Sequence, residues 1–375
     1  MKIINVVGAR PNLIKMAPIV AALAKHPDLF TQFLVHTGQH YDESMSRLLF
    51  QQLGLPHPDI DLDVGSGSHG VQTGQIMAKF EEVCHAERPD LVIVVGDVNS
   101  TMACTITAKK LGIQVAHVEA GLRSRDMSMP EEINRLCTDV LCDYLFTTDR
   151  FANENLRQEG IAEERIHFVG NVMIDTLAMH RAAAQNLGLM QRLGLKAGRF
   201  ATLTLHRPSN VDDPDVLLAI LEALREISIE LPIVFPIHPR TRKMIEQFGY
   251  FSFFTSGEKA QGIWMAQPFG YLEFLHLNMH ARMVLTDSGG LQEETTALGV
   301  PCITLRSNTE RPITCEEGTN QLVGNAKERI LKAARRVLDG SPSAGRVPEK
   351  WDGKAAERIV HVLQHSFRTH RTLSA

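Results

Sequence analysis

Short apolar segments alternate with longer amphipathic segments along the chain, and this alternation limits the fold more than any other feature. Apolar runs that alternate with helices are typical of a parallel sheet covered by helices on both faces. In the first half we expect helices such as 14–25 and 101–111, and strands near 3–7, 32–36, 91–95, 114–118 and 144–147.

The same pattern restarts after Gly170 and Asn171, with strands expected near 200–205, 233–237, 263–266, 283–286 and 302–305. A chain of 375 residues also has room for two domains of about 150 residues each. The sequence therefore predicts an α/β protein with two Rossmann-like doubly wound parallel-sheet domains facing a central cleft, a geometry suited to a nucleotide-bearing ligand. We expect the first domain over 1–172, the second over 173–354 with a helical stretch near 177–193 leading into it, and a C-terminal helix within 355–375.

Composition excludes several classes of function. The chain has 39 basic and 43 acidic residues, a formal charge of −4, so it offers no bulk attraction to nucleic acid or to an anionic membrane. The first strand starts almost at the N-terminus, and no apolar run is long enough to span a bilayer, which favours a cytoplasmic protein. The six cysteines show no metal-type spacing, so we expect reduced thiols and no structural metal.

Two carboxylates follow neighbouring predicted strands of the first domain. Asp97 comes one glycine after the strand 91–95, and Glu119 directly follows the strand 114–118. Open α/β sheets bind ligands at the carboxyl ends of their strands. Because arginines and further acids crowd the next turns, we interpret this edge as a sugar-nucleotide active site.

Glu131 has two interpretations. The spacing of Ser128 and Glu131 fits a capping box, with Arg135 one turn later as an ion-pair partner of Glu131. Alternatively, the preceding loop brings this helix start to the end of the Glu119 strand and adds a third carboxylate. Crowded carboxylates raise one another's pKa, which suits acid and base work at neutral pH.

The second domain carries a candidate phosphate site. After the strand 283–286, Ser288, Gly289 and Gly290 open a helix whose free N–H groups suit a pyrophosphate, and Glu294 lies one turn on, where it could bind a ribose. Alternatively, Ser288 only caps the helix. Arg311, after the next strand, is either a phosphate ligand or a surface charge.

Other candidates remain open between binding and structural roles. His206 and His238 each end a strand and suit a diphosphate, but capping or core roles compete. Phe269 and Phe274 could meet a base ring, although the core is the better expectation for them. Arg10 and Lys15 follow the first strand and could reach a phosphate, while the glycine-rich stretch 64–74 favours a flexible loop.

The motifs GARPNLIK (8–15), GDVNST (96–101), HVEAGLRS (117–124), MPEEINR (129–135), LTDSGGLQEE (285–294) and TERP (309–312) occur in this order along nearly the whole chain. Together they resemble the non-hydrolysing UDP-N-acetylglucosamine 2-epimerases. The resemblance implies a GT-B glycosyltransferase-like fold, a last helix that returns to the first domain, a homodimer, and neither metal nor nicotinamide cofactor.

The family reaction interconverts UDP-N-acetylglucosamine and UDP-N-acetylmannosamine by anti elimination of UDP to 2-acetamidoglucal and its re-addition. By the resemblance, the diphosphate would be bound by Arg10, His206, Ser288, Gly289, Gly290 and Arg311. Asp97, Glu119 and Glu131 would surround the sugar, with the proton-abstracting group undecided among them. Glu294 would bind ribose, the Phe269 backbone and Phe274 would meet uracil, and Lys15 and Arg135 would line the cleft.

Departures from the family pattern keep alternatives open. The segments 39–42 and 66–74 differ from those of allosterically activated enzymes and look closer to relatives that act on UDP-2,3-diacetamido-hexuronic acids. A hydrolysing enzyme that releases N-acetylmannosamine typically has a different first loop. A glycosyltransferase does not need so many carboxylates, and a non-catalytic sugar-nucleotide sensor could lose Asp97, Glu119 and Glu131, all of which are present.

Overall fold

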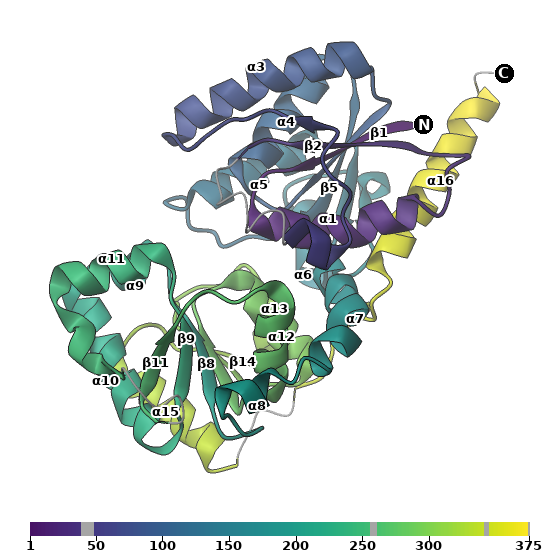
Figure 1. The fold of residues 1–375 in the computed structure, drawn as a ribbon. Helices are drawn as coiled ribbons and strands as arrows, with labels where there is room; N and C mark the ends of the chain where they lie inside the picture. The colour runs from purple at the N-terminus through teal and green to yellow at the C-terminus, as the bar shows by residue number, and fades with distance from the viewer. Residues whose placement is uncertain (39–48, 256–260, 341–344, 374–375) are drawn as a thin grey trace. The chain divides into compact units, whose positions relative to one another are not determined.

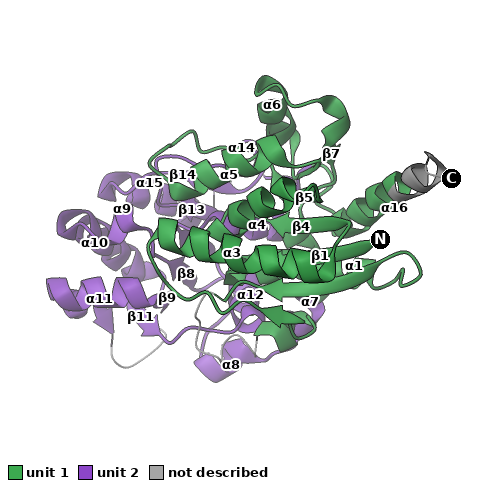
Figure 2. Ribbon diagram, turned by 90° about the horizontal axis from the view of Figure 1, so that it is seen from above, with its two compact units in different colours: residues 1–179, 349–375 green, residues 180–348 purple. Residues whose placement is uncertain are grey.

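The computed structural model describes residues 1–38, 49–255, 261–340 and 345–373. Within these ranges the chain forms two seven-stranded parallel sheets with helices around each (Figure 1). It divides into two compact units (Figure 2): unit 1 comprises residues 1–179 and 349–375, and unit 2 comprises residues 180–348. The predicted α/β class with two doubly wound parallel sheets is confirmed. The segment 39–42, which differs in sequence from that of allosterically activated enzymes, lies outside the described residues.

The sheet of unit 1 has the strand order β3-β2-β1-β4-β5-β6-β7. All strands run parallel, and successive strands are added on one side of β1 up to β3 and on the other side from β4 onward. The boundary between β1 and β4 is therefore the switch point where such sheets bind ligands. The central strand β4 is LVIVV and is buried along its whole length, as expected for a strand covered on both faces. The strands are β1 (Lys2–Val7), β2 (Thr31–His36), β3 (Ile60–Asp61), β4 (Leu91–Val95), β5 (Gln114–Ala120), β6 (Tyr144–Thr147) and β7 (Ile166–Phe168).

Helices cover both faces of this sheet (Figure 1). One layer packs α3 against α4 and α4 against α5, and another pairs α1 with α16. The bounds are α1 (Arg10–Leu23), α3 (His69–Glu87), α4 (Asn99–Lys110), α5 (Pro130–Leu141), α6 (Arg150–Gln158), α7 (Val172–Gln185) and α16 (Ala355–Leu373). The flexible loop expected over 64–74 is wrong from His69 onward, because α3 already begins there.

The last helix belongs to unit 1 although 169 residues of unit 2 precede it in the chain. Its N-terminus is capped by Asp175 of α7, whose two carboxylate oxygens accept the Ala355 and Ala356 backbone N–H groups at 3.0 and 2.7 Å. The hydrogen bonds satisfy donors that a helix start leaves without intrahelical partners.

Unit 2 repeats the architecture with the strand order β10-β11-β9-β8-β12-β13-β14 and a switch point between β8 and β12. Its strands are β8 (Ala201–Thr204), β9 (Ile233–Pro236), β10 (Phe254–Thr255), β11 (Ile263–Ala266), β12 (Met283–Thr286), β13 (Cys302–Thr304) and β14 (Asn320–Leu322). Its helices are α8 (Leu189–Leu193), α9 (Pro208–Val211), α10 (Pro214–Glu230), α11 (Pro239–Phe248), α12 (Tyr271–His280), α13 (Gly289–Leu298), α14 (Pro312–Glu316) and α15 (Lys327–Leu338).

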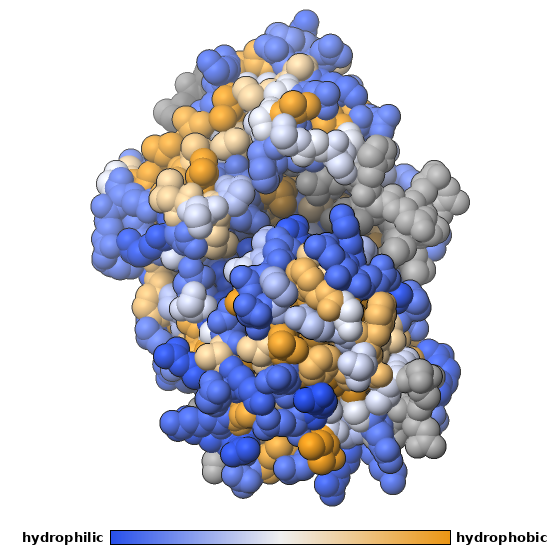
Figure 3. Space-filling view, turned by 90° about the vertical axis from the view of Figure 1, so that its left-hand side faces the viewer, coloured by the Kyte–Doolittle hydropathy of each residue, from blue (hydrophilic) through white to orange (hydrophobic). Residues whose placement is uncertain are grey.

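Apolar side chains fill the space between each sheet and its helices. One such cluster joins strands of unit 2 to α10 and α15 and contains fully buried residues such as Leu217, Phe235 and Ile330. On the face drawn in Figure 3, hydrophobic side chains gather in separate groups among hydrophilic ones. In the described part of the chain, every helix is too short or too polar to cross a membrane.

Candidate active site

Unit 1 places the predicted carboxylates beside its switch point. Asp97 lies just beyond β4, and Glu119 lies near the end of the adjacent strand β5. Asn12 fixes the start of α1 to the same edge, because its amide donates to the Val95 carbonyl at 2.8 Å and its oxygen accepts the Ala9 N–H at 2.9 Å. Arg10, the first residue of α1, is partly exposed at this edge.

Glu119 has an unusual backbone conformation. Its φ angle is +75°, and the pairing of β5 with β6 shifts register between Val118 and Ala120, so Glu119 forms a bulge. A bulge changes the direction in which a side chain points. A positive φ at a residue other than glycine costs about 1–3 kcal/mol, and residues with such strained backbone conformations are concentrated at functional sites. The carboxylate accepts a hydrogen bond from Lys15 Nζ at 2.7 Å, and the two side chains are only 1% and 6% exposed.

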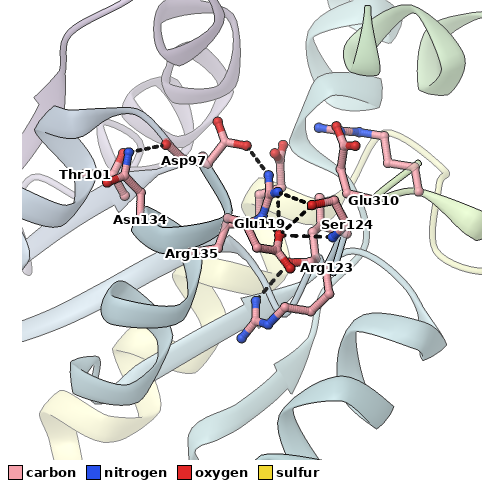
Figure 4. Close-up of polar contacts among 12 residues, drawn as sticks. Asp97, Thr101, Glu119, Arg123, Ser124, Asn134, Arg135 and Glu310 are labelled. Atoms are coloured by element: carbon pink, nitrogen blue, oxygen red, sulfur yellow. Dashed lines mark hydrogen bonds and ion pairs between the residues drawn. The ribbon is translucent and has the colours of Figure 1, made fainter. Parts of the chain in front are cut away.

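Arg135 of α5 joins two carboxylates (Figure 4). One guanidinium nitrogen donates to Asp97 Oδ2 at 2.6 Å, and two others donate to Glu132 Oε2 at 2.6 and 2.9 Å. Burial opposes ionisation of Glu132, but hydrogen bonds from Ser124, Arg135 and Arg125 outweigh it and lower the pKa of this carboxyl. Cations thus alternate with the carboxylates at this edge. The sequence had suggested carboxylates that crowd one another, without cations between them.

Glu131 lies in the first turn of α5 and is partly exposed. The capping box proposed for Ser128 and Glu131 is not formed: Met129 occupies the N-cap position without a side-chain cap, and the Ser128 hydroxyl donates to Asp126 instead. Glu131 lies on the same helix as the ion pair of Glu132 with Arg135. Its role as a third carboxylate at this edge stays a prediction.

In unit 2, His206 is oriented by Asp287, the residue that follows β12. His206 Nδ1 lies 2.8 Å from Asp287 Oδ1, and Asp287 Oδ2 accepts the backbone N–H groups of His206 and Arg207 at 2.9 and 2.7 Å. Burial raises the cost of ionising Asp287, but the His206 side chain and these backbone donors prevail and lower its pKa. The His206 ring is 36% exposed, so the imidazole remains accessible to a ligand.

His238 lies beside His206, with ring centroids 5.5 Å apart. It caps α11, since its Nδ1 accepts the Arg240 backbone N–H at 3.2 Å, so the capping interpretation is confirmed. Burial and the neighbouring His206 lower the pKa of His238. Nδ1 is thus an acceptor, which leaves Nε2 to donate to a ligand.

The loop after β12 leads into α13 with Ser288 at the N-cap position, but the Ser288 side chain makes no capping hydrogen bond. The interpretation of Ser288 as only a cap is therefore wrong. A Cβ atom on Gly289 would lie 2.5 Å from Arg311 Nη1, so a larger residue there would displace the guanidinium. Arg311 is buried and pairs with Glu293 at 3.0 Å and with Glu310. Arg311 is therefore part of a buried ion-pair network beneath the turn and not a surface charge. Gly290 is the second residue of α13 and is partly exposed.

The remaining candidates lie on α12 and α13 or just before them. Glu294 is 5% exposed, and its carboxylate accepts the Tyr271 hydroxyl at 3.4 Å. Phe269 contacts the Trp264 ring edge-on, and Phe274 packs against a cluster of Val284, Leu291 and Val300. Both rings are partly buried, as the core interpretation predicted.

Sequence reasoning missed several charged residues that support these groups: Glu132, Asp139, Asp287, Glu293 and Glu310. Asp287 had a usable signal, since it follows a strand end just as Asp97 and Glu119 do. Asp139 lies within α5, and only the fold shows that it contacts β5. In the described ranges, no three His, Cys, Asp or Glu side chains are grouped so that they could hold a metal ion.

The comparisons with known proteins agree with this geometry. The model of the UDP-N-acetylglucosamine 2-epimerase family matches residues 21–364. A Methanocaldococcus jannaschii protein named UDP-N-acetylglucosamine 2-epimerase is 44% identical over 97% of this chain and 99% of its own length. A Pseudomonas aeruginosa protein named UDP-2,3-diacetamido-2,3-dideoxy-D-glucuronate 2-epimerase is 42% identical over 97% and 99%.

A solved structure extends the similarity to three dimensions. The crystal structure of the M. jannaschii UDP-GlcNAc 2-epimerase in complex with UDP-GlcNAc and UDP matches with a TM-score of 0.89, at 44% identity over 97% of this chain and 100% of that one. With a family match over most of its length and relatives this similar, the chain belongs to the UDP-N-acetylglucosamine 2-epimerase family.

Proposed function

We propose that this protein reversibly converts UDP-N-acetylglucosamine to UDP-N-acetylmannosamine without net hydrolysis. The observation that carries the proposal is the placement of Glu119 on a strained bulge, paired with Lys15, beside Asp97 paired with Arg135. Carboxylates held rigidly on strand ends can remove a proton from carbon 2 and return one to the other face.

The chemistry requires the anomeric bond to break as the proton leaves, since no carbonyl makes the carbon 2 proton acidic. Asp97, Glu119 and Glu131 serve as the proton-transfer groups and stabilise positive charge on the sugar ring. Negative charge on the departing UDP is stabilised by donors, among which His206 and the α13 amides at Gly289 and Gly290 are the strongest candidates. Return of UDP to carbon 1 completes the epimerisation.

The other ligand contacts follow from the family pattern. Arg10, His238 and Ser288 contribute to diphosphate binding. Arg311, whose charge is already balanced by Glu293 and Glu310, acts by shaping the turn at Gly289. Glu294 binds the ribose hydroxyls, and the Phe269 backbone and Phe274 meet the uracil.

A second candidate substrate is a UDP-2,3-diacetamido-hexuronic acid. The Pseudomonas relative named for such a substrate is 42% identical, close to the 44% of the M. jannaschii enzyme. The proton transfer and elimination would be the same, and only the substituents at carbons 3 and 5 would differ.

Proton NMR in deuterated water tests both substrates. Loss of the carbon 2 proton signal together with formation of UDP-N-acetylmannosamine supports the first proposal, whereas free N-acetylmannosamine and UDP identify a hydrolysing enzyme. Exchange only with the diacetamido-uronate supports the second candidate. No exchange with either compound overturns the proposed function.

We also propose that the protein forms a homodimer through α5. Ile133, Val140 and Leu141 fall on one side of this helix and are 43%, 60% and 37% exposed, and Met127 in the loop before it is 60% exposed. Light scattering after size exclusion should give twice the chain mass of 41.7 kDa. Val140→Glu should give the monomer mass, and Ile229→Glu, at a separate position that is 82% exposed, should not. A monomeric wild type would refute the dimer.

A further inference from the structure

His117 of β5 is fully buried, and both nitrogens of its ring meet hydrogen-bond acceptors. Nδ1 lies 2.6 Å from Asp139 Oδ1, and Nε2 lies 2.8 Å from the Gly96 carbonyl oxygen. A backbone carbonyl can only accept a hydrogen bond. Asp139 Oδ2 accepts from the Gly121 N–H at 3.0 Å and pairs with Arg123 at 2.7 Å, as an ionised carboxylate does.

A neutral imidazole can donate from only one nitrogen. In this site it would turn a lone pair toward either the Asp139 carboxylate or the Gly96 carbonyl, and an unmade buried hydrogen bond is costly. Only an imidazolium, protonated on both nitrogens, satisfies both contacts.

Neighbouring charges compensate for burying the imidazolium. Asp139 comes from α5, Arg123 from the turn after β5, and Glu159, which pairs with Arg123 at 2.6 Å, follows α6. Two positive and two negative groups therefore alternate in one network. Burial opposes ionisation of Asp139, yet His117 and Arg123 lower its pKa.

The two contacts of His117 lead to the two turns that carry Asp97 and Glu119. Gly96, which accepts from Nε2, precedes Asp97, and its own N–H donates to the Val118 carbonyl at 3.0 Å. Asp139, which accepts from Nδ1, also binds the N–H of Gly121, two residues after Glu119. Gly121 passes so close to α6 that a Cβ atom there would lie 2.4 Å from the Ala152 carbonyl oxygen.

We infer that His117 is a doubly protonated positioning residue that fixes the Asp97 turn relative to the Glu119 turn, within one sheet. The inference rests on the proposed function in one respect, the catalytic roles of Asp97 and Glu119. His117 itself is buried in the sheet and acts through Gly96 and Asp139.

Ring protonation is measured directly by NMR on the full-length protein labelled with ¹⁵N-histidine. The wild type should show two exchange-protected N–H groups on this ring, and both signals should be absent in His117→Gln. A single ring N–H overturns the inference. The outcome does not depend on which substrate the protein uses.

The positioning role is measured by amide hydrogen exchange and by kinetics. His117→Gln should speed exchange of the Gly121 N–H at least roughly tenfold and lower kcat for carbon 2 exchange roughly 100-fold, the effect of a misplacement of about 1 Å, with KM changed less than about threefold. Asp139→Asn should act in the same direction, which covers the case in which one variant fails to fold.

His167→Gln is the matched control, since this histidine lies on β7 of the same sheet with its ring against Tyr144 and Phe146. It should leave the Gly121 exchange rate and kcat near the wild-type values. Unchanged Gly121 exchange in both His117→Gln and Asp139→Asn would overturn the positioning role. A wild type inactive on both substrates would refute the proposed function and leave the exchange result valid.

Discussion

Lys15 Nζ lies 2.7 Å from Glu119 Oε1, and the pair joins the first turns of α1 to the end of β5 across 104 residues of sequence. Both groups are almost fully buried, so the pair has lost most of its hydration. Such a pair depends on both partners, because a buried charge deprived of its counterion is strongly destabilising.

We predict that Lys15→Met destabilises the protein by about 3 kcal/mol or more and abolishes carbon 2 exchange, since the Glu119 carboxylate loses its cation. Urea denaturation and NMR exchange measure the two effects. Lys109→Met is the control: Lys109 pairs with Asp143 at 2.8 Å, but the side chains are 28% and 32% exposed, so a smaller loss of about 1 kcal/mol is expected. Equal losses in the two variants would contradict the prediction.

Arg135→Lys should lower kcat/KM roughly 100-fold although it keeps the positive charge. A lysine ammonium cannot reproduce the planar fork that contacts Asp97 and Glu132 together, so the Asp97 side chain loses its fixed orientation. Arg157→Lys breaks a similar fork to Glu163 on the exposed surface and should change kcat/KM less than about twofold. A wild-type rate in Arg135→Lys would show that the fork is not needed.

Asp287→Asn should lower kcat by a factor on the order of 10² to 10⁴, as expected when a histidine loses the carboxylate that orients it. The amide oxygen can still accept the backbone N–H groups of His206 and Arg207, but its NH₂ group now faces His206 Nδ1. Measurements of kcat from pH 5 to 9 should also give a pH profile that differs from that of the wild type. Asp212→Asn, which alters an exposed pair with Arg240, should keep the wild-type profile. The orienting role fails if Asp287→Asn matches the wild type in both respects.

Asp175 should make stability depend on pH. Burial, only partly offset by the Ala356 and Ala355 N–H donors, raises the pKa of Asp175 from 3.8 to about 6. A carboxyl with a raised pKa in the folded state contributes stability below pH 4, and this contribution is lost as the pH rises through about 6. The stability of Asp175→Asn relative to wild type should therefore increase by roughly 2.5 kcal/mol between pH 4 and pH 7. Denaturant titrations at both pH values measure it, and a constant difference would contradict it.

The sequence predicted the long buried strands well but missed β3, β7, β10 and β14. These contain two or three residues each and lie at sheet edges. A strand this short is too brief to give a recognisable apolar pattern in the sequence, and it is identified only by its pairing with one neighbouring strand. The single helical stretch expected over 177–193 is interrupted at Gly188, whose φ of +59° ends the run between α7 and α8. Such breaks are set by tertiary packing as much as by local preference.

At the candidate site, strand-end position was enough to find Asp97, Glu119 and His206, because parallel strands present their carboxyl ends on one edge. The supporting ion pairs could not be found that way. His117 and Asp139 are 22 residues apart on a strand and a helix, and no spacing rule links them. Lys15 was identified as a cation near the edge, but its partner across 104 residues was not.

The capping of α16 by Asp175 has a consequence for biosynthesis. A ribosome releases residues 1–179 long before it makes residues 349–375, so the part of the protein synthesised first is completed last. Until then the surface of α1 that receives α16 stays exposed, and Asp175 has no helix to cap. A nascent chain of this protein therefore passes through a stage in which every residue of unit 2 has been made while unit 1 still lacks its last helix.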